Sequence, residues 1–295
     1  MVPSDLRILL LFILSALLPM PSAMAAPAEF RFVGADADLV TVADMKAARD
    51  QPAAWAMLEQ YLPPEEQARL AELQGALGVN VRRDADQLLL SGPSRNPDAM
   101  VAALTGRFDP KAIGARAAKI PGYKTGKLSG LPVHAIPSGG GILVAFPSPG
   151  IMLLASEFTA MEKAIATGAA GGVARKVGGA YPTATAGRGA PILWLDGIEP
   201  DLAMLALPPA IAGLPLDRAT LGMWLKGNQA ALDGKLRARD AESANRIALG
   251  LKGLAALSWM QAEHSDPLSA LLAQSEVRAG SDPREVLVTG SALWP

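Results

Sequence analysis

The chain has 295 residues, 50% of them hydrophobic and 19% charged, and 27 Lys and Arg against 28 Asp and Glu leave a net charge of −1. This balance excludes the electrostatic footprint of a general nucleic-acid binder and a basic surface that seeks partners. The absence of Cys excludes disulfide scaffolds, thiolate zinc sites, iron–sulfur clusters, cysteine nucleophiles and lipid anchoring through Cys.

The first 25 residues have the parts of a secretory signal. Arg7 supplies the amino-terminal charge, Ile8–Leu18 is an apolar run, and Ala23-Met24-Ala25 forms an A-x-A cleavage site. The alternative is a retained membrane anchor, but the apolar run is shorter than the ~20 residues that cross a bilayer. We expect cleavage after Ala25 and a soluble mature protein, periplasmic or secreted, without a transmembrane segment.

Hydrophobic spacing and turn residues predict helices and strands in the first half of the chain. An apolar strand-like segment runs from Phe30 to Leu39, where small and acidic residues predict a turn and a helix start. Gly78 stands where a helix would take its C-terminal glycine cap. The expected elements are a short first helix, helices at 50–62 and 65–77, strands at 87–92 and 100–108, a helix from Asp109 to Lys119, strands at 128–136, 141–146 and 151–156, and a helix at 159–166.

Residues 168–191 are rich in Gly, Ala and Thr and are typical of a linker or long surface loop. Beyond them, Ala230–Arg239 alternates apolar and charged residues, which predicts a strand with one buried and one solvated face. Asp240 caps a long helix whose apolar stripe, ending at Trp259, is expected against the sheet. The other expected elements are a strand at 192–195, a helix toward Leu207, a strand at 219–226 with a hairpin turn at Gly227-Asn228, a short helix at 266–273 and a strand at 285–293.

Two short patterns recur in the same order in both halves. Gly34-x-Asp36-x-Asp38-Leu39 matches Gly197-x-Glu199-x-Asp201-Leu202 at an offset of 163 residues, and Leu104-Thr105-Gly106-Arg107 parallels Leu232-Asp233-Gly234-Lys235. We infer an internal duplication: an α+β fold of two related units, each an antiparallel sheet with helices packed mainly on one face. The expected domains are a signal peptide at 1–25, an N-terminal domain at 26–170, a linker at 171–191 and a C-terminal domain at 192–295, with the sheets able to join edge to edge.

Four local patterns resemble those of a loose group of uncharacterised exported bacterial proteins. They are Gly78-Val-Asn-Val-Arg-Arg-Asp84, Gly106-Arg-Phe-Asp109, Gly122-Tyr-Lys124 and Leu153-Leu-Ala-Ser-Glu157. Asn80 departs from the acidic turn residue of that group, and Thr125 intervenes before Gly126. The resemblance covers roughly Phe30 to Gly168 and implies export and this fold, and it brings no catalytic residues.

The paired acids are the candidate metal ligands, since D-x-D spacing in a turn can direct two carboxylates at one hard cation. These weak candidates are Asp36, Asp38, Glu199 and Asp201. The competing reading is helix capping, in which an Asp accepts backbone N–H bonds and needs no ligand. We favour capping and expect no resident metal and no cofactor.

Other patterns that could carry chemistry are incomplete. Lys124-Thr125-Gly126 matches the K-T-G triplet of serine β-lactamases, but the chain has no S-x-x-K to supply the nucleophile. The chain likewise has no G-x-S-x-G, P-loop or dinucleotide fingerprint. His134 and His264 are read as solvated or hydrogen-bonded residues, because neither has a second His nearby in the sequence.

Three classes of function remain. The first is a non-catalytic binding or structural component of the periplasm or cell envelope with a protein partner, which a flat exposed apolar patch would favour. The second is a hydrolase whose acid and base groups meet only in the fold. The third is a carrier of a small apolar ligand between the domains near residues 168–191. We favour the first, and whether the protein is an enzyme stays open.

Overall fold

A computed structural model describes residues 28–50, 71, 74–137, 141–171, 176–179, 181, 191–200, 215–226, 229–261 and 267–293. The signal segment, Asp201, His264, the turn at Gly227-Asn228, the helix toward Leu207 and most of the helices expected at 50–77 lie outside these residues. The elements below are those of the described part of the chain.

In the first half, short helices and antiparallel strands alternate before one longer helix. The elements are η1 (Ala28–Phe32), β1 (Leu39–Asp44), α2 (Met45–Arg49), α5 (Val81–Asp84), β2 (Ala85–Gly92), η2 (Pro97–Ala99), β3 (Val101–Gly106), α6 (Pro110–Ala117), β4 (Lys124–Leu128), β5 (Leu131–Ile136), β6 (Ile142–Ser148), β7 (Ile151–Ala155) and α7 (Phe158–Ala169). In the second half they are β8 (Leu193–Ile198), β9 (Leu216–Lys226), β10 (Gln229–Ala238), α10 (Ala241–Gln261), α11 (Pro267–Ala273), β11 (Glu276–Ala279) and β12 (Glu285–Leu293).

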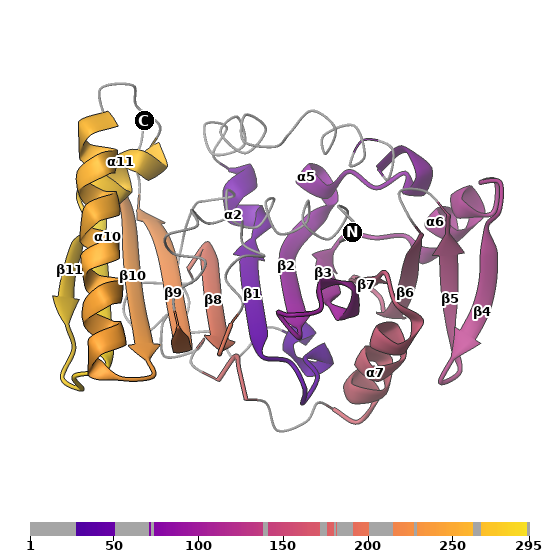
Figure 1. Ribbon diagram of the computed structural model, residues 1–295. Coiled ribbons are helices and arrows are strands. Elements are labelled where there is room, and N and C mark those ends of the chain that lie inside the picture. Colours follow the sequence, from indigo (N-terminus) through magenta and orange to yellow (C-terminus); the bar gives the residue numbers. More distant parts are fainter. Residues whose placement is uncertain are drawn as a thin grey trace.

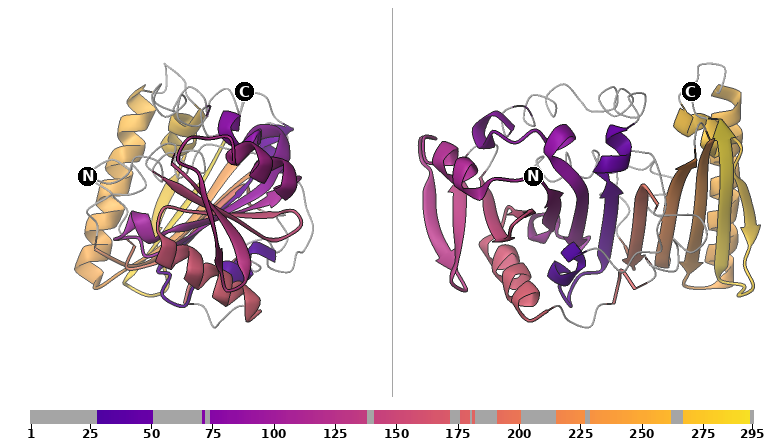
Figure 2. Two further views of the ribbon diagram at one scale, coloured as in Figure 1. Left: turned by 90° about the vertical axis from the view of Figure 1, so that its right-hand side faces the viewer. Right: turned by 180° about the vertical axis from the view of Figure 1, so that it is seen from behind.

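The twelve strands form one sheet in the order β11-β12-β10-β9-β8-β1-β2-β3-β7-β6-β5-β4, shown edge to edge in Figure 1. The halves join where β1 pairs antiparallel with β8, Val42 opposite Trp194. Every strand pair is antiparallel, which confirms the expected α+β class. Whether the two halves share one sheet was open from the sequence, and the structure joins them in one. The view from the β4 side shows the strands fanned by the sheet twist (Figure 2).

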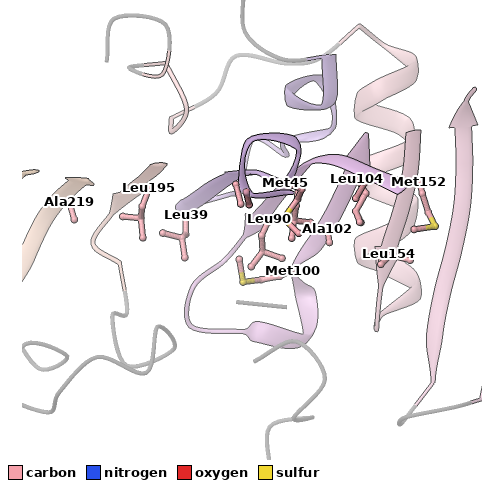
Figure 3. Packing of buried hydrophobic residues seen from close by; sticks show 14 of the residues in the cluster. Leu39, Met45, Leu90, Met100, Ala102, Leu104, Met152, Leu154, Leu195 and Ala219 are labelled. Atoms are coloured by element: carbon pink, nitrogen blue, oxygen red, sulfur yellow. The ribbon is translucent and has the colours of Figure 1, made fainter. Parts of the chain in front are cut away.

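Both faces of the central strands are buried, and a separate apolar cluster covers each. The first cluster includes Leu39, Leu90 and Leu104 from the strands, Ile113 of α6 and Ile247 of α10. Figure 3 shows part of it, with labelled side chains from β1, β2, β3, β7, β8 and β9. The second lies on the opposite face, where η1 and α7 pack on alternate residues of the same strands. Helices thus divide between the two faces: α6 and α10 lie on one, η1 and α7 on the other.

The capping signals at Asp109, Asp240 and Gly78 are confirmed. The helix capping favoured for Asp36 and Asp38 is wrong, because a strand follows them. The carboxylate of Asp109 accepts hydrogen bonds from the backbone N–H groups of Lys111 and Ala112 at the start of α6. Asp240 accepts one from Ser243 at 2.6 Å at the start of α10. Gly78 has a φ of 68°, the left-handed conformation that a glycine adopts at a helix end at low cost.

The first expected strand is wrong. Phe30 and Phe32 belong to the short helix η1, and the strand begins only at Leu39. The turn at Gly34–Asp38 therefore precedes a strand, and the expected helix start at Asp36 and Asp38 is also wrong. An apolar run of this length cannot distinguish a strand from a buried helical turn, because both place hydrophobic side chains against the core.

A hairpin was missed within the strand expected at 128–136. The chain reverses at Ser129 and Gly130, whose φ angles of 48° and 81° suit a two-residue hairpin turn. The additional strand, β4, pairs with β5 and lies at the end of the sheet. Ser-Gly is a turn signal, but the apolar residues on both sides concealed it.

The two halves share an order of elements. In each, three antiparallel strands precede a helix, and the last strand after the helix pairs with the third: β7 with β3, and β12 with β10. The sequence match at Gly34 and Gly197 does not follow this order, since Gly34 precedes β1 whereas Gly197 lies within β8. Descent from a duplicated unit and the division into two domains stay predictions.

Candidate functional site

The acids singled out in the sequence each have a separate partner. Asp36 is exposed, and its carboxylate accepts a hydrogen bond from Nζ of Lys163 at 2.8 Å, which lowers the pKa of Asp36. Asp38 accepts a hydrogen bond from the backbone N–H of Ser94 at 2.6 Å. This bond joins the residue before β1 to the connection between β2 and β3.

Glu199 lies at the surface just beyond β8, with its carboxylate 3.8 Å from Arg95. Its φ of 45° is left-handed, a conformation that is uncommon for a residue other than Gly. Within the described ranges, no three His, Asp or Glu side chains are grouped so that they could hold a metal ion. Asp36, Asp38 and Glu199 do not form such a group, although the backbone C=O of Asp38 accepts a hydrogen bond from the N–H of Ile198, the residue before Glu199. Asp201 lies outside the described residues.

His134 is hydrogen-bonded, one of the two states predicted for it, and it also packs against two aromatic rings. Its Nδ1 lies 2.6 Å from the hydroxyl of Tyr123, and the two rings stack with centroids 5.9 Å apart. The ring of Phe146 meets His134 edge-on at 6.3 Å. Burial lowers the pKa of His134, so the neutral ring is favoured. Lys124 lies nearby in β4, where its side chain is exposed at the sheet edge.

Sequence analysis missed a buried carboxylate at Asp196. This side chain is fully buried on β8 and accepts two hydrogen bonds from Arg218, at 2.9 and 2.7 Å. Thr220 and the backbone N–H of Gly178 also donate to it. The two-pronged contact with one guanidinium satisfies both oxygens. The sequence offered one sign of this site, an Asp next to an apolar strand segment. That sign does not reveal which residue pairs with the Asp.

A second buried acid, Glu29 of η1, was also missed. It is 1% exposed, and its Oε1 has no hydrogen-bond partner within the part of the chain that the structure describes. Burial raises the pKa of Glu29 to about 7, and the negative charge of Asp44 adds to the effect. The pKa of Asp44 is raised in turn, chiefly by its own burial.

Beside Glu29, aromatic rings fill the space on this face of the sheet. Tyr181 contacts Phe30 and Trp194 with ring centroids 5.4 and 5.2 Å apart, and all three side chains are buried. Val177 is also fully buried in this cluster. Val177 and Tyr181, two residues of the predicted linker, are therefore part of this packed cluster.

The outer face of α10 is the largest departure from the expected burial. The stripe predicted to pack on the sheet is buried at Ala244 and Ile247, but Trp259 at its end is 70% exposed, so its expected packing is wrong. Leu249 and Leu257 are 69% and 52% exposed. We define the outer face of α10 as Leu249, Gly253, Ala256 and Leu257, which repeat at helical spacing and are all exposed.

This face is unusually apolar for a solvent-facing helix surface. From Ile247 to Gln261, Lys252 supplies the one charged side chain. A Cβ atom added at Gly250 or Gly253 would meet no atom within 4 Å, so the surface beside these glycines is open. A helix normally turns a charged face to water, and this face departs from that pattern. Among the described helices, none is long and apolar enough to cross a membrane.

No family model matches the chain, and no curated protein matches it. Similarity is found to solved structures of TP0453. Crystal form III has a TM-score of 0.57 and 12% identity, and the match covers 92% of this chain and 96% of that one. Crystal form I has a TM-score of 0.55 and 11% identity, and the match covers 91% of this chain and 94% of that one. Crystal form IV has a TM-score of 0.52 and 10% identity, and the match covers 90% of this chain and 92% of that one. These values show a shared fold over nearly the whole chain.

Proposed function

We propose that the chain is an exported, non-catalytic binding component of the periplasm or cell envelope that contacts a partner protein through the outer face of α10. The observation that carries the proposal is the exposure of Leu249 and Leu257 on the outer face of α10; Trp259, at the end of the stripe that was expected to face the sheet, is exposed as well. Single exposed apolar residues are ordinary, whereas several on one helix face form a surface that water solvates poorly.

The composition of this stripe suits a protein partner. Gly253 and Ala256 are small residues beside the larger side chains of Leu249 and Leu257, so a partner's side chains could pack between the two leucines. Trp259 supplies a large amphipathic ring of the kind enriched in the energetic centres of interfaces. The opposite side of the helix stays anchored, since Ala244 and Ile247 are buried against the sheet.

The export component rests on the sequence of residues 1–25 and on the resemblance described above. The non-catalytic component is supported by the separate engagements of the predicted acids: Asp36 pairs with Lys163, and Asp38 bonds to Ser94. His134 is likewise engaged with Tyr123. Each contact has a structural role, and none directs a free nucleophile or base at a common point.

Photo-crosslinking in the native cell tests the proposed surface. A photo-crosslinking amino acid at position 257 is expected to give a discrete protein adduct, and the same group at Arg278, exposed on β11, is the control. A Leu249→Ser change in the same chain should abolish the adduct. Equal adducts at both positions, or an adduct with lipid alone, would contradict the proposal. The mass of the recovered protein separately tests cleavage after Ala25.

A further inference from the structure

The strand β4 forms one open end of the sheet. It pairs with β5 on one side, and it is the last strand in the sheet order, at the right of Figure 1. Its first four residues, Lys124 to Lys127, are all exposed, and only Leu128 is buried. An end strand presents unpaired backbone donors and acceptors to which another strand can bond.

The hydrogen-bonding pattern identifies the residues that face outward. Lys127 lies opposite Pro132, which has no N–H to donate, so this pair is a non-hydrogen-bonded position of the β4–β5 ladder. The pattern alternates along an antiparallel pair, so Thr125 opposite His134 is also such a position. The backbone N–H and C=O groups of Thr125 and Lys127 therefore point away from β5, toward the open edge.

This end of the molecule carries a strong local charge. The chain from Lys111 to Ser156 contains no Asp or Glu. Its five basic residues are all exposed, and no described acid forms an ion pair with any of them: Lys111, Arg116, Lys119, Lys124 and Lys127. The preceding acid, Asp109, is engaged in capping α6. The exclusion of a basic surface, drawn from the net charge of −1, therefore does not hold at this end of the sheet.

We propose that β4 binds an extended acidic segment of a partner protein as an added strand. Thr125 and Lys127 supply the backbone bonds, and the side chains of Lys124 and Lys127, three residues apart, project to opposite faces of the sheet, where they pair with acidic side chains of the segment. This second surface goes beyond the α10 contact proposed above.

The positive charge of β4 also disfavours pairing with the β4 strand of a second copy of the chain. Lysine on an edge strand discourages pairing of two copies of one chain, because like charges then face each other. An acidic segment removes that repulsion, so the same residues that prevent self-association favour this class of partner. At the opposite end of the sheet, β11 carries Glu276 and Arg278 and has no such single sign of charge.

Peptide binding to the purified chain starting at Ala26 tests the proposal. The probe is a fluorescent peptide of seven residues that alternates Glu with Val and Thr, compared with the same peptide carrying Lys in place of Glu. Fluorescence anisotropy is expected to show binding of the acidic peptide and none of the basic one. Lys124→Gln combined with Lys127→Gln should weaken binding about tenfold, whereas Lys252→Gln on α10 should leave it unchanged.

A backbone variant separates strand addition from simple charge attraction. Thr125→Pro removes an outward N–H and keeps both lysines, and it should abolish binding, with circular dichroism checking that the fold is retained. Binding that is insensitive to Thr125→Pro would overturn the proposal, as would absence of binding to the unaltered chain. A third outcome would also overturn the proposal: the unaltered and Thr125→Pro chains attach equally to phosphatidylglycerol vesicles, and neither binds the peptide. The basic residues would then bind an anionic lipid surface and not an added strand.

Discussion

Nη2 of Arg218 lies 2.7 Å from Oδ2 of Asp196, and this ion pair spans the neighbouring strands β8 and β9. Asp196 is fully buried, whereas the side chain of Arg218 is 40% exposed. Without its cation, the buried carboxylate would lower the free energy of unfolding, because its charge would lie in a medium that solvates it poorly. The same carboxylate also accepts a hydrogen bond from the backbone N–H of Gly178, so Asp196 connects β8 to the segment around Gly178 as well.

Removal of the cation should destabilise the fold strongly. Arg218→Met is expected to lower the free energy of unfolding by about 3 kcal/mol, and Arg218→Met with Asp196→Asn should recover part of the loss. Arg239→Gln is the control, because Arg239 is 57% exposed and lies 3.9 Å from Asp217; its effect should stay within about 0.5 kcal/mol. Urea unfolding measures all three variants. Equal losses for Arg218→Met and Arg239→Gln would contradict the assigned role.

Glu29 should make stability depend on pH. The pKa of Glu29 is raised from 4.5 to about 7 in the folded chain, so the folded state holds the proton more tightly than the unfolded state. The free energy of unfolding should therefore fall as the pH rises from about 4.5 to about 7, by roughly 3 kcal/mol in total. The raised pKa of Asp44 adds a dependence of the same sign.

Glu29→Gln should remove most of this dependence, since Gln keeps the shape and cannot ionise. Urea unfolding at about pH 5 and about pH 8 measures the change. Glu162→Gln, at an exposed position of the neighbouring helix α7, should retain the pH dependence of the unaltered chain. A Glu29→Gln variant with the original slope would show that another group titrates in this window.

Two glycines in helices should respond in opposite directions to Ala. A Cβ at Gly168 of α7 would overlap the buried ring of Phe32, whereas one at Gly250 of α10 would meet no atom within 4 Å. Gly168→Ala should destabilise the chain by about 1–3 kcal/mol, because the ring has to move within a packed core. Gly250→Ala should stabilise it by about 0.5–1 kcal/mol through helix propensity. Thermal unfolding compares the two, and stabilisation by both would mean that Phe32 repacks freely.

The outer face of α10 should contribute little to folding. Leu249→Ser with Leu257→Ser is expected to lower the free energy of unfolding by less than about 1 kcal/mol, since both side chains are more than half exposed. Ile247→Ala, on the buried side of the same helix, should cost about 2–4 kcal/mol. Chemical denaturation checks both variants. A large loss from the double Ser variant would show that the face packs within the molecule.

Much of the secondary structure follows from local sequence. The caps Asp109 and Asp240 and the glycine end at Gly78 sit where the patterns placed them, because a cap depends on a few neighbouring residues. The segment at Phe30 was assigned to the wrong element, since an apolar run fits either a strand or a helical turn. The hairpin at Ser129 was hidden because apolar residues flank its turn on both sides.

The sequence by itself determined the α+β class, the antiparallel strands and the charge of each segment, since these depend on local periodicity and on composition. Only the tertiary structure decided which residues act together. It paired Asp196 with Arg218, buried Glu29, exposed Trp259, which was expected to pack on the sheet, and placed the lysines of β4 at an open edge. Those outcomes depend on which strands are neighbours and where a helix leaves the sheet, and residues distant in sequence fix both.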